Sequence, residues 1–339
     1  MREARFIKQN VEKWTQYQHE PVEDPEETAN RFITLLDDLS YAKTFYPKSK
    51  VTLWINGIAS TTYQKIYKNK KIEWKRLWFF WKLELPLLFK KYHKVLLATF
   101  LLFATFVLIG IISSNTDPEY GRQYFDNNVQ KGYYDRTIDN IRSGDPFGVY
   151  KDDNQFSMFV RIAYNNISVA FKTVTFGLLF GIGTLFMMWN NGVMLGCFQY
   201  LFFAQGLGWQ SIMVIWIHGT IEISSIVIAG CAGFIIGFGW LFPGTYTRMQ
   251  SFRRAVKDAM KIWVSLVPFF IVAAFFESYV THLMSNTFQK NSTNIGLPVP
   301  VSIIILLASL SLIIWYFIIY PIRLAHALKT NDEKRLNLS

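Results

Sequence analysis

Six apolar stretches separated by charged segments constrain the fold of this 339-residue chain more than any other feature. About 20 consecutive apolar residues are enough to cross the hydrocarbon core of a membrane as a helix. The chain is 51% hydrophobic and only 17% charged. We therefore predict an all-α, polytopic membrane protein with about six transmembrane helices. The expected spans are about 95–113, 167–189, 192–205, 210–241, 262–283 and 299–320.

The charges between these stretches are distributed unevenly, and their distribution predicts the orientation of the chain. Residues 1–94 hold 18 Lys and Arg against 11 Asp and Glu, and residues 245–261 hold 5 against 1. The segment 114–165 has the opposite balance, with 6 basic and 8 acidic residues. Because basic loops are enriched on the cytoplasmic side of membranes, six crossings place both termini in the cytoplasm. The net charge of +11 thus reflects topology and indicates no nucleic-acid partner.

The chain divides by composition into three parts. Residues 1–94 form a cytoplasmic helical region, in which 25–69 is expected to be a small helical hairpin. Its last part, 72–94, mixes aromatic and basic side chains, a composition typical of the lipid headgroup layer. Pro86 predicts a bend there, so this part is expected to be an interfacial elbow helix. Residues 95–321 then form the transmembrane domain with an external loop at 114–165, and 322–339 form a cytoplasmic tail.

His218 and Glu222 place two ionisable groups inside the apolar stretch 210–241. Four residues apart on a helix, they lie one above the other and can pair. Ionisable side chains within membrane spans usually face a protein interior or a water-filled cavity. Two interpretations stay open: the pair locks one helix against its neighbours, or it belongs to a functional polar site.

Two further charged residues are predicted to lie at a similar depth. With the spans given above, Lys172 lies about 9 Å inside the outer end of the second span, at 1.5 Å per residue. Glu277 lies close to the outer end of the fifth span. We therefore predict an outward-facing polar cluster of Lys172, His218, Glu222 and Glu277, unless Lys172 reaches the outer interface alone.

The stretch 192–205 is short for a membrane span. Its 14 residues rise about 21 Å as a helix, against about 30 Å of hydrocarbon. Treating it as re-entrant would move the basic segment 245–261 outside, so we predict that it crosses. A short helix beside the long 210–241 span predicts a cavity near the outer surface.

The sequence does not predict an enzyme. A zinc-peptidase helix needs His-Glu-x-x-His, whereas here one His and one Glu share the face and the other histidines are scattered. We expect no catalytic residues, no cofactor and no metal. Small residues four apart, such as Gly192 with Gly196 and Gly233 with Gly237, favour close helix packing.

The order of these motifs resembles the stage II sporulation protein M family of bacterial polytopic membrane proteins. The resemblance runs from the N-terminal helical region through the fifth span. Its motif residues are Asn165, Asn166, Gly181, Gly183, Asn191, Gly192, Gly196, His218, Gly219, Glu222, Gly230, Gly233, Pro243, Gly244, Arg248 and Glu277. In endospore formers, the resemblance implies action with two wall-degrading partners. In other bacteria, members often occur beside genes for MoxR-type ATPases.

Two functions are carried forward. The first is a non-enzymatic scaffold or complex subunit of the cell envelope, located in the bacterial cytoplasmic (inner) membrane. Its partners would be the lipid bilayer and other envelope membrane or periplasmic proteins, such as peptidoglycan-remodelling proteins; a homo-oligomer stays open. The loop 114–165 would dock a partner, or else simply pack over its own spans. The alternative is a permease or channel subunit that works with a separate ATPase.

Overall fold

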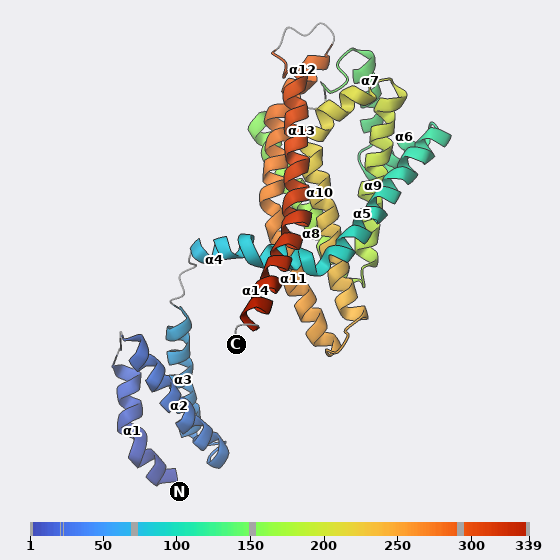
Figure 1. Ribbon diagram of the computed structural model, residues 1–339. Coiled ribbons are helices and arrows are strands. Elements are labelled where there is room, and N and C mark those ends of the chain that lie inside the picture. Colours follow the sequence, from blue (N-terminus) through green and yellow to red (C-terminus); the bar gives the residue numbers. More distant parts are fainter. Residues whose placement is uncertain are drawn as a thin grey trace. The chain divides into compact units, whose positions relative to one another are not determined.

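The computed structural model describes residues 3–20, 22, 24–68, 74–148, 154–289 and 295–336. Every regular element in these ranges is a helix, so the predicted all-α class is confirmed. The chain divides into two compact units, Met1–Phe79 and Phe80–Ser339. Figure 1 labels their helices, and each unit is described here by itself.

The first unit holds a bundle of three helices: α1 (Glu3–His19), α2 (Pro25–Phe45) and α3 (Lys50–Lys68). Its core contains Trp14, Leu35 and Ile55, all fully buried. The hairpin predicted over 25–69 is therefore incomplete, because α1 packs against it. Helix α1 is polar overall and buries only Phe6 and Trp14, so few apolar residues mark it in the sequence.

The elbow is a helix, but it bends at a different residue from the one predicted. Helix α4 (Trp74–Phe79) continues through the wide turn η1 (Phe80–Glu84) into α5 (Leu85–Thr116). The backbone leaves helical geometry at Tyr92, with φ −104° and ψ 16°. Pro86 lies in the first turn of α5, where a missing N–H breaks no helical hydrogen bond. Residues 72 and 73 of the predicted elbow lie outside the described residues.

The start of α5 is fixed to a later helix of the second unit, α11 (Arg248–Phe275), by charged side chains. Lys261 Nζ lies 2.7 Å from Glu84 Oε2. One turn of α11 earlier, Asp258 Oδ2 accepts from Lys91 Nζ at 2.7 Å and from the Tyr92 hydroxyl at 2.8 Å. The bend at Tyr92 is thus held by a direct contact with α11.

Within the described residues, four helices are long and apolar enough to cross a membrane, which makes the chain a multi-pass membrane protein. They are Trp74–Thr116, Gly208–Leu241 (α10), Arg248–Phe288, and Val299–Thr330. The third joins α11, η4 (Phe276–Thr281) and α12 (His282–Phe288). The fourth contains α13 (Val299–Ile314), η5 (Trp315–Ile319) and the start of α14 (Tyr320–Leu336).

The predicted second and third spans have the wrong boundaries. The structure forms α8 over Gln155–Thr175, reverses through η3 (Phe176–Leu178), and forms α9 over Ile182–Ala204. Phe180 and Gly181 both have positive φ, 55° and 87°, which completes the reversal. Because the residues of this turn are themselves apolar, their hydropathy does not distinguish the turn from a continuous membrane span. Helix α9 has 23 residues, so the predicted short helix is wrong, and the cavity inferred from its shortness loses its basis.

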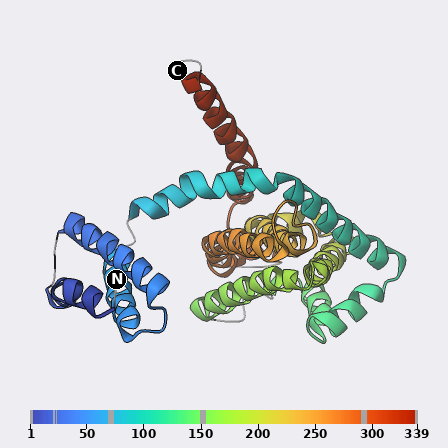
Figure 2. The same ribbon diagram turned by 90° about the horizontal axis from the view of Figure 1, so that it is seen from below.

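Helix α10 is the central element of the second unit. It packs against α5, α8, α9, α11 and α13, and Figure 2, which looks along these helices, shows α8, α9 and α11 gathered around it. Glycines allow especially close packing at two places, between η3 and α10 and between α9 and α5. A Cβ on Gly177 would lie 2.1 Å from the Gly233 carbonyl oxygen, and one on Gly196 would lie 2.2 Å from the Val107 carbonyl oxygen. These glycines allow backbone-to-backbone contact of the kind predicted.

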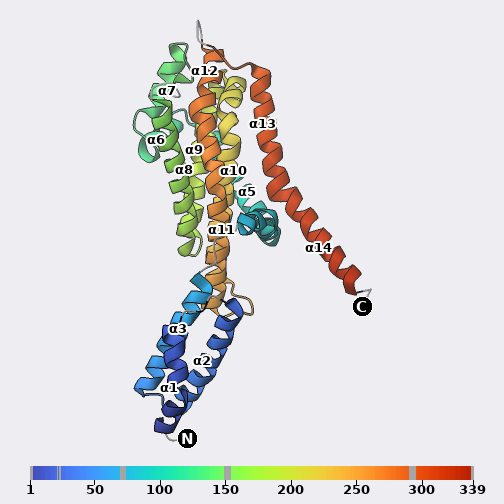
Figure 3. The same ribbon diagram turned by 90° about the vertical axis from the view of Figure 1, so that its left-hand side faces the viewer.

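Two short helices, α6 (Tyr120–Asn128) and α7 (Tyr133–Arg142), form a cap over one end of the second unit. Figure 1 and Figure 3 show α7 at the same end as α12, and we call this the cap end. The rings of Phe125 and Tyr133 stack at 5.7 Å, and the Tyr124 hydroxyl donates to the Asn190 carbonyl of α9 at 3.0 Å. Burial raises the pKa of the Tyr133 phenol to about 12.

The cap formed by α6 and α7 accounts for only part of the predicted external loop 114–165. Residues 155–165, which were expected to belong to the external loop 114–165, form the first half of α8. Residues 149–153 of that loop lie outside the described residues. The described part of the loop is therefore helical and packed on the bundle.

Candidate functional site

A buried polar cluster lies between α10 and η4 in the second unit. His218 and Glu222 occupy successive turns of α10, as predicted, and Glu277 comes from η4. One ligand-type atom from each side chain lies within 4.8 Å of the other two. The structure therefore brings His218, Glu222 and Glu277 together. His218 Nε2 lies 3.9 Å from Glu277 Oε2, so this contact joins two elements of the bundle.

The cluster is deep in the bundle. His218 lies ten residues after the start of α10, or about 15 Å along its axis at 1.5 Å per residue. Glu277 lies eleven residues before the end of α12, about 16 Å from the cap end. The side chain of His218 is 6% exposed and that of Glu277 is 17% exposed. Both groups therefore depend on protein contacts more than on solvent.

Thr281 orients the imidazole. Its hydroxyl donates to the Phe276 carbonyl oxygen at 3.1 Å and lies 3.0 Å from His218 Nδ1. A hydroxyl has one hydrogen to donate, so the Thr281 oxygen accepts from Nδ1–H. The lone pair of a neutral His218 is then on Nε2, which faces Glu277. Both Thr281 and Glu277 lie in η4, a wide helical turn of the type that often occurs at functional sites.

Asn166 of α8 completes the surroundings of the cluster. It is buried and lies close to the Glu222 carboxyl. Among the described residues, its Nδ2 has no partner in hydrogen-bonding geometry. Sequence analysis singled out Asn166 as a motif residue but did not place it beside Glu222, because the predicted second span began one residue later. Thr281 was missed as well, although it follows Glu277 by one helical turn.

Lys172 does not join the cluster. It is exposed and lies three residues before the end of α8, which begins at the cap end. Its depth from that end is about 25 Å, instead of the 9 Å expected. Arg161, earlier on the same helix, is the basic residue whose charge acts on Glu277.

Most of the other motif residues lie at close helix contacts or in turns. Gly183 and Gly192 lie where a Cβ would meet Phe176 and Phe106 within 2.8 Å, and a Cβ on Gly230 would meet Met188. Asn191 donates to the Met187 carbonyl, whereas Asn165 is exposed. Pro243 and Gly244 form the turn after α10, with φ 61° at the glycine, and Arg248 is the first residue of α11. Gly219 is the exception, because a Cβ there would find its nearest atom at 3.9 Å.

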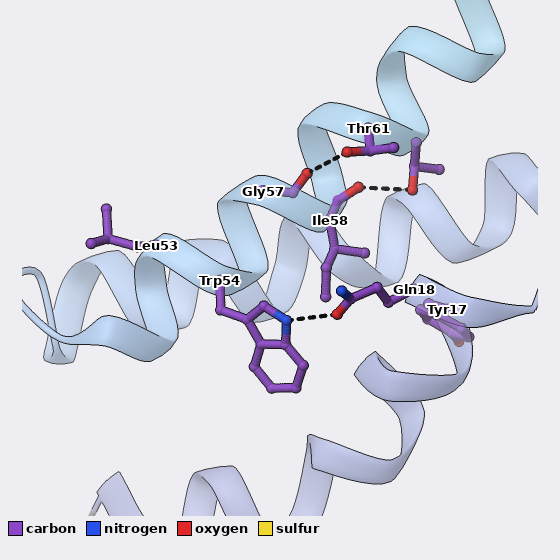
Figure 4. Close-up of a pocket in the computed structure, with 8 residues that line it drawn as sticks. Tyr17, Gln18, Leu53, Trp54, Gly57, Ile58 and Thr61 are labelled. Atoms are coloured by element: carbon purple, nitrogen blue, oxygen red, sulfur yellow. Dashed lines mark hydrogen bonds between the residues drawn. The ribbon is translucent and has the colours of Figure 1, made fainter.

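The first unit has a shallow groove of about 360 Å³ between α1 and α3. Figure 4 shows Trp54 across its floor, with the indole N–H donating to Gln18 Oε1 at 2.8 Å. Leu53 on its rim is 73% exposed. The groove is lined by Tyr17, Gln18, Leu53, Trp54, Gly57, Ile58, Thr61 and Thr62.

Models of known families match parts of both units. The model of the family described as stage II sporulation protein M matches residues 99–282, more than half of the chain, and contains the whole polar cluster. The match starts within α5, so it does not include the N-terminal region as the sequence resemblance had implied. Residues 4–68 match a separate domain of unknown function, DUF8413. No curated protein and no solved structure matches the chain significantly.

Proposed function

The chain belongs to the stage II sporulation protein M family, and from this premise we propose that it is a non-enzymatic scaffold of the bacterial cell envelope. It would sit in the cytoplasmic membrane and hold partners such as peptidoglycan-remodelling proteins at the outer surface. The observation that carries this proposal is the cap formed by α6 and α7. A scaffold needs a rigid surface that projects from the membrane, because a preorganised surface loses less entropy on binding.

The cap meets this requirement through its attachment to the bundle. Phe147, just after α7, is fully buried and stacks on Phe202 of α9 at 5.2 Å. Ser285 of α12 donates to the Phe147 carbonyl oxygen at 3.3 Å. The outward side chains are polar or charged, among them Gln123, Asn127, Lys131, Arg136, Asp139 and Arg142. Such a surface suits a soluble periplasmic domain and not another apolar helix.

We further propose six crossings, with both termini in the cytoplasm. Helices α8 and α9 would add two crossings to the four long apolar helices, since both pack alongside α10 (Figure 3) and their 21 and 23 residues are enough to cross the hydrocarbon core. Polar residues make both helices less apolar than these four, among them Lys172 in α8 and Asn190, Asn191 and Gln199 in α9. Gln199 is partnered inside the bundle, by Ser211 and Trp216.

Cysteine labelling tests this topology. A cysteine replacing the exposed Lys131 should react with an impermeant maleimide in intact cells, whereas one replacing the exposed Arg253 should react only after permeabilisation. The native Cys197 and Cys231 are buried, which keeps the background low. Labelling of the Arg253 position in intact cells would contradict the six-span topology.

Charge reversal on the cap tests the scaffold role without unfolding it. Replacing the whole loop would expose Phe198 and Phe202, so point variants are preferable. The double variant Lys131→Glu and Arg142→Glu should accumulate normally but recover at least tenfold less of the envelope partner in quantitative affinity purification. The matched control is Lys8→Glu, an exposed charge on α1. Equal recovery from the cap variant and wild type would count against docking at the cap.

The buried cluster favours a second candidate, a permease or channel subunit. Ionisable groups at membrane depth often mark ion or substrate pathways. Such a subunit would need a separate ATPase or another energy source. Purification in mild detergent separates the candidates: a periplasmic wall enzyme supports the scaffold, and a cytoplasmic ATPase that is retained by the cap variant supports the permease.

A further inference from the structure

We propose that His218, Glu222 and Glu277 together bind one divalent transition-metal cation inside the membrane domain. This inference is independent of the scaffold and permease roles, because it concerns only what the three side chains can coordinate. The sequence had predicted no metal, since it lacks the second histidine of a zinc-peptidase helix. The ligand that replaces this histidine, Glu277, comes from another helix 55 residues later.

The geometry leaves room for an ion among the three groups. The contact of 3.9 Å between His218 Nε2 and Glu277 Oε2 is too long for a hydrogen bond. Zinc lies about 2.0–2.2 Å from nitrogen and carboxylate ligands, so two of its ligand atoms are separated by about 3.3 Å in a tetrahedron. The three ligand atoms of the cluster lie within 4.8 Å of one another. Small rotations of the two Glu side chains would bring them onto one ion.

The charges of the cluster also favour a cation. Two carboxylates near each other in a poorly hydrated interior repel, and a neutral imidazole does not compensate for them. A divalent ion would balance both. Lys172, the cation that sequence analysis expected here, is three residues from the far end of α8. Arg161 is exposed and acts on Glu277 from the cap side.

The surroundings have the features of an outer coordination shell. Metal-bound histidines usually donate their second ring N–H to a neighbouring acceptor, which fixes the tautomer. Thr281 accepts this bond from Nδ1 and leaves Nε2 facing the acids. Independently, the amide nitrogen of the buried Asn166 lacks a hydrogen-bond partner among the described residues, although it lies close to Glu222. A Glu222 oxygen or a water held by the ion would satisfy it.

The donor set indicates which ions to expect. Imidazole favours zinc, cobalt, iron or nickel, whereas magnesium and calcium prefer ligand sets made only of oxygen. Because the ligands come from α10 and η4, a bound ion would fix α10 to the helix that contains α11 and α12.

The test uses the full-length protein in detergent, without an affinity tag and after chelation. Zinc bound after saturation and desalting is measured by elemental analysis, and cobalt binding is followed by its visible absorption. We expect about one metal ion per chain, with the affinity lowered at least tenfold by Glu222→Gln and by Glu277→Gln. Thr281→Val, which removes the hydroxyl that contacts His218 and the Phe276 carbonyl but none of the three ligands, should weaken binding about 10- to 100-fold.

Two controls keep the result interpretable. Glu84→Gln removes a carboxylate from an ion pair at the other end of the same unit, and His93→Gln removes an exposed imidazole. Both should bind metal like wild type, and Glu277→Asp should retain partial affinity. Zinc should raise the unfolding temperature of wild type but not of the Gln variants. The site would be refuted if wild type bound less than about one ion per ten chains. It would also be refuted if the Glu222→Gln/Glu277→Gln double variant bound as much metal as wild type.

Discussion

Replacing Gly233 by alanine is expected to destabilise the transmembrane domain by about 1–3 kcal/mol or more, the range for overpacking a close-packed core. The added methyl group would lie 2.3 Å from Thr184 Oγ1 and 2.7 Å from the Thr173 carbonyl oxygen. Thr184 cannot rotate away freely, because it is buried and donates to that same Thr173 carbonyl at 2.8 Å. The backbone of α8 or α10 would have to move instead.

The effect should be large because this contact holds the reversal between α8 and α9. On the other side of the same contact, a Cβ on Gly177 would lie 2.1 Å from the Gly233 carbonyl oxygen. One on Gly237 would lie 2.6 Å from the Gly181 backbone nitrogen. Gly233 and Gly237 of α10 thus pack directly against Gly177 and Gly181 of the turn. Separating them would also lift η3 from α10.

Gly219 provides a matched control within the same helix. An alanine there meets nothing closer than 3.9 Å, so Gly219→Ala should leave the unfolding temperature unchanged or slightly raise it. Both variants would be purified in one detergent, and thermal unfolding followed by circular dichroism and by loss of monodisperse protein. Equal unfolding temperatures for the two would show that α10 and the turn do not pack as closely as described.

The same turn shows where sequence reasoning succeeded and where it failed. Helix α10 was placed within two residues of its observed bounds, since its long apolar run contains no turn signal and ends at Pro243 and Gly244. The reversal at 176–181 was missed because its exposed Phe and Leu side chains look like those of a membrane span. In a lipid environment a turn can be apolar, so hydropathy alone does not separate two helices there.

One boundary error produced the main error in the candidate site. Merging the end of α8 with the start of α9 put Lys172 near the outer surface and left Asn166 just outside the span. In the structure their roles are exchanged: Asn166 is buried at the cluster, and Lys172 is exposed near the other end of the helix. The three other predicted residues lie together, because α10 begins within two residues of its predicted start and the predicted span 262–283 lies inside the observed helix Arg248–Phe288. Depth counted along a helix is only as accurate as its starting residue.

Replacing His218 by leucine is expected to lower the stability of the membrane domain by about 1–3 kcal/mol, the cost of leaving buried polar groups without a partner. Leucine cannot face Glu277 with a nitrogen, and it leaves the Thr281 hydroxyl without the imidazole N–H that it accepts. Glu222 and Glu277 would then remain beside each other without an imidazole. The folded yield should fall several-fold, and complementation of a deletion strain should fail.

Ser225→Ala is the matched control for this variant. Ser225 is also fully buried in α10, but its hydroxyl donates only to the Ile221 carbonyl oxygen of its own helix, at 2.8 Å. That carbonyl is on a regular turn of the helix, so losing the side-chain bond should cost less than about 1 kcal/mol. The two variants would be compared by membrane-fraction yield, unfolding temperature and complementation. If His218→Leu matches Ser225→Ala in all three measurements, the contact between His218 and the two acids contributes neither to assembly nor to function, and the cluster is a passive feature of the helix packing.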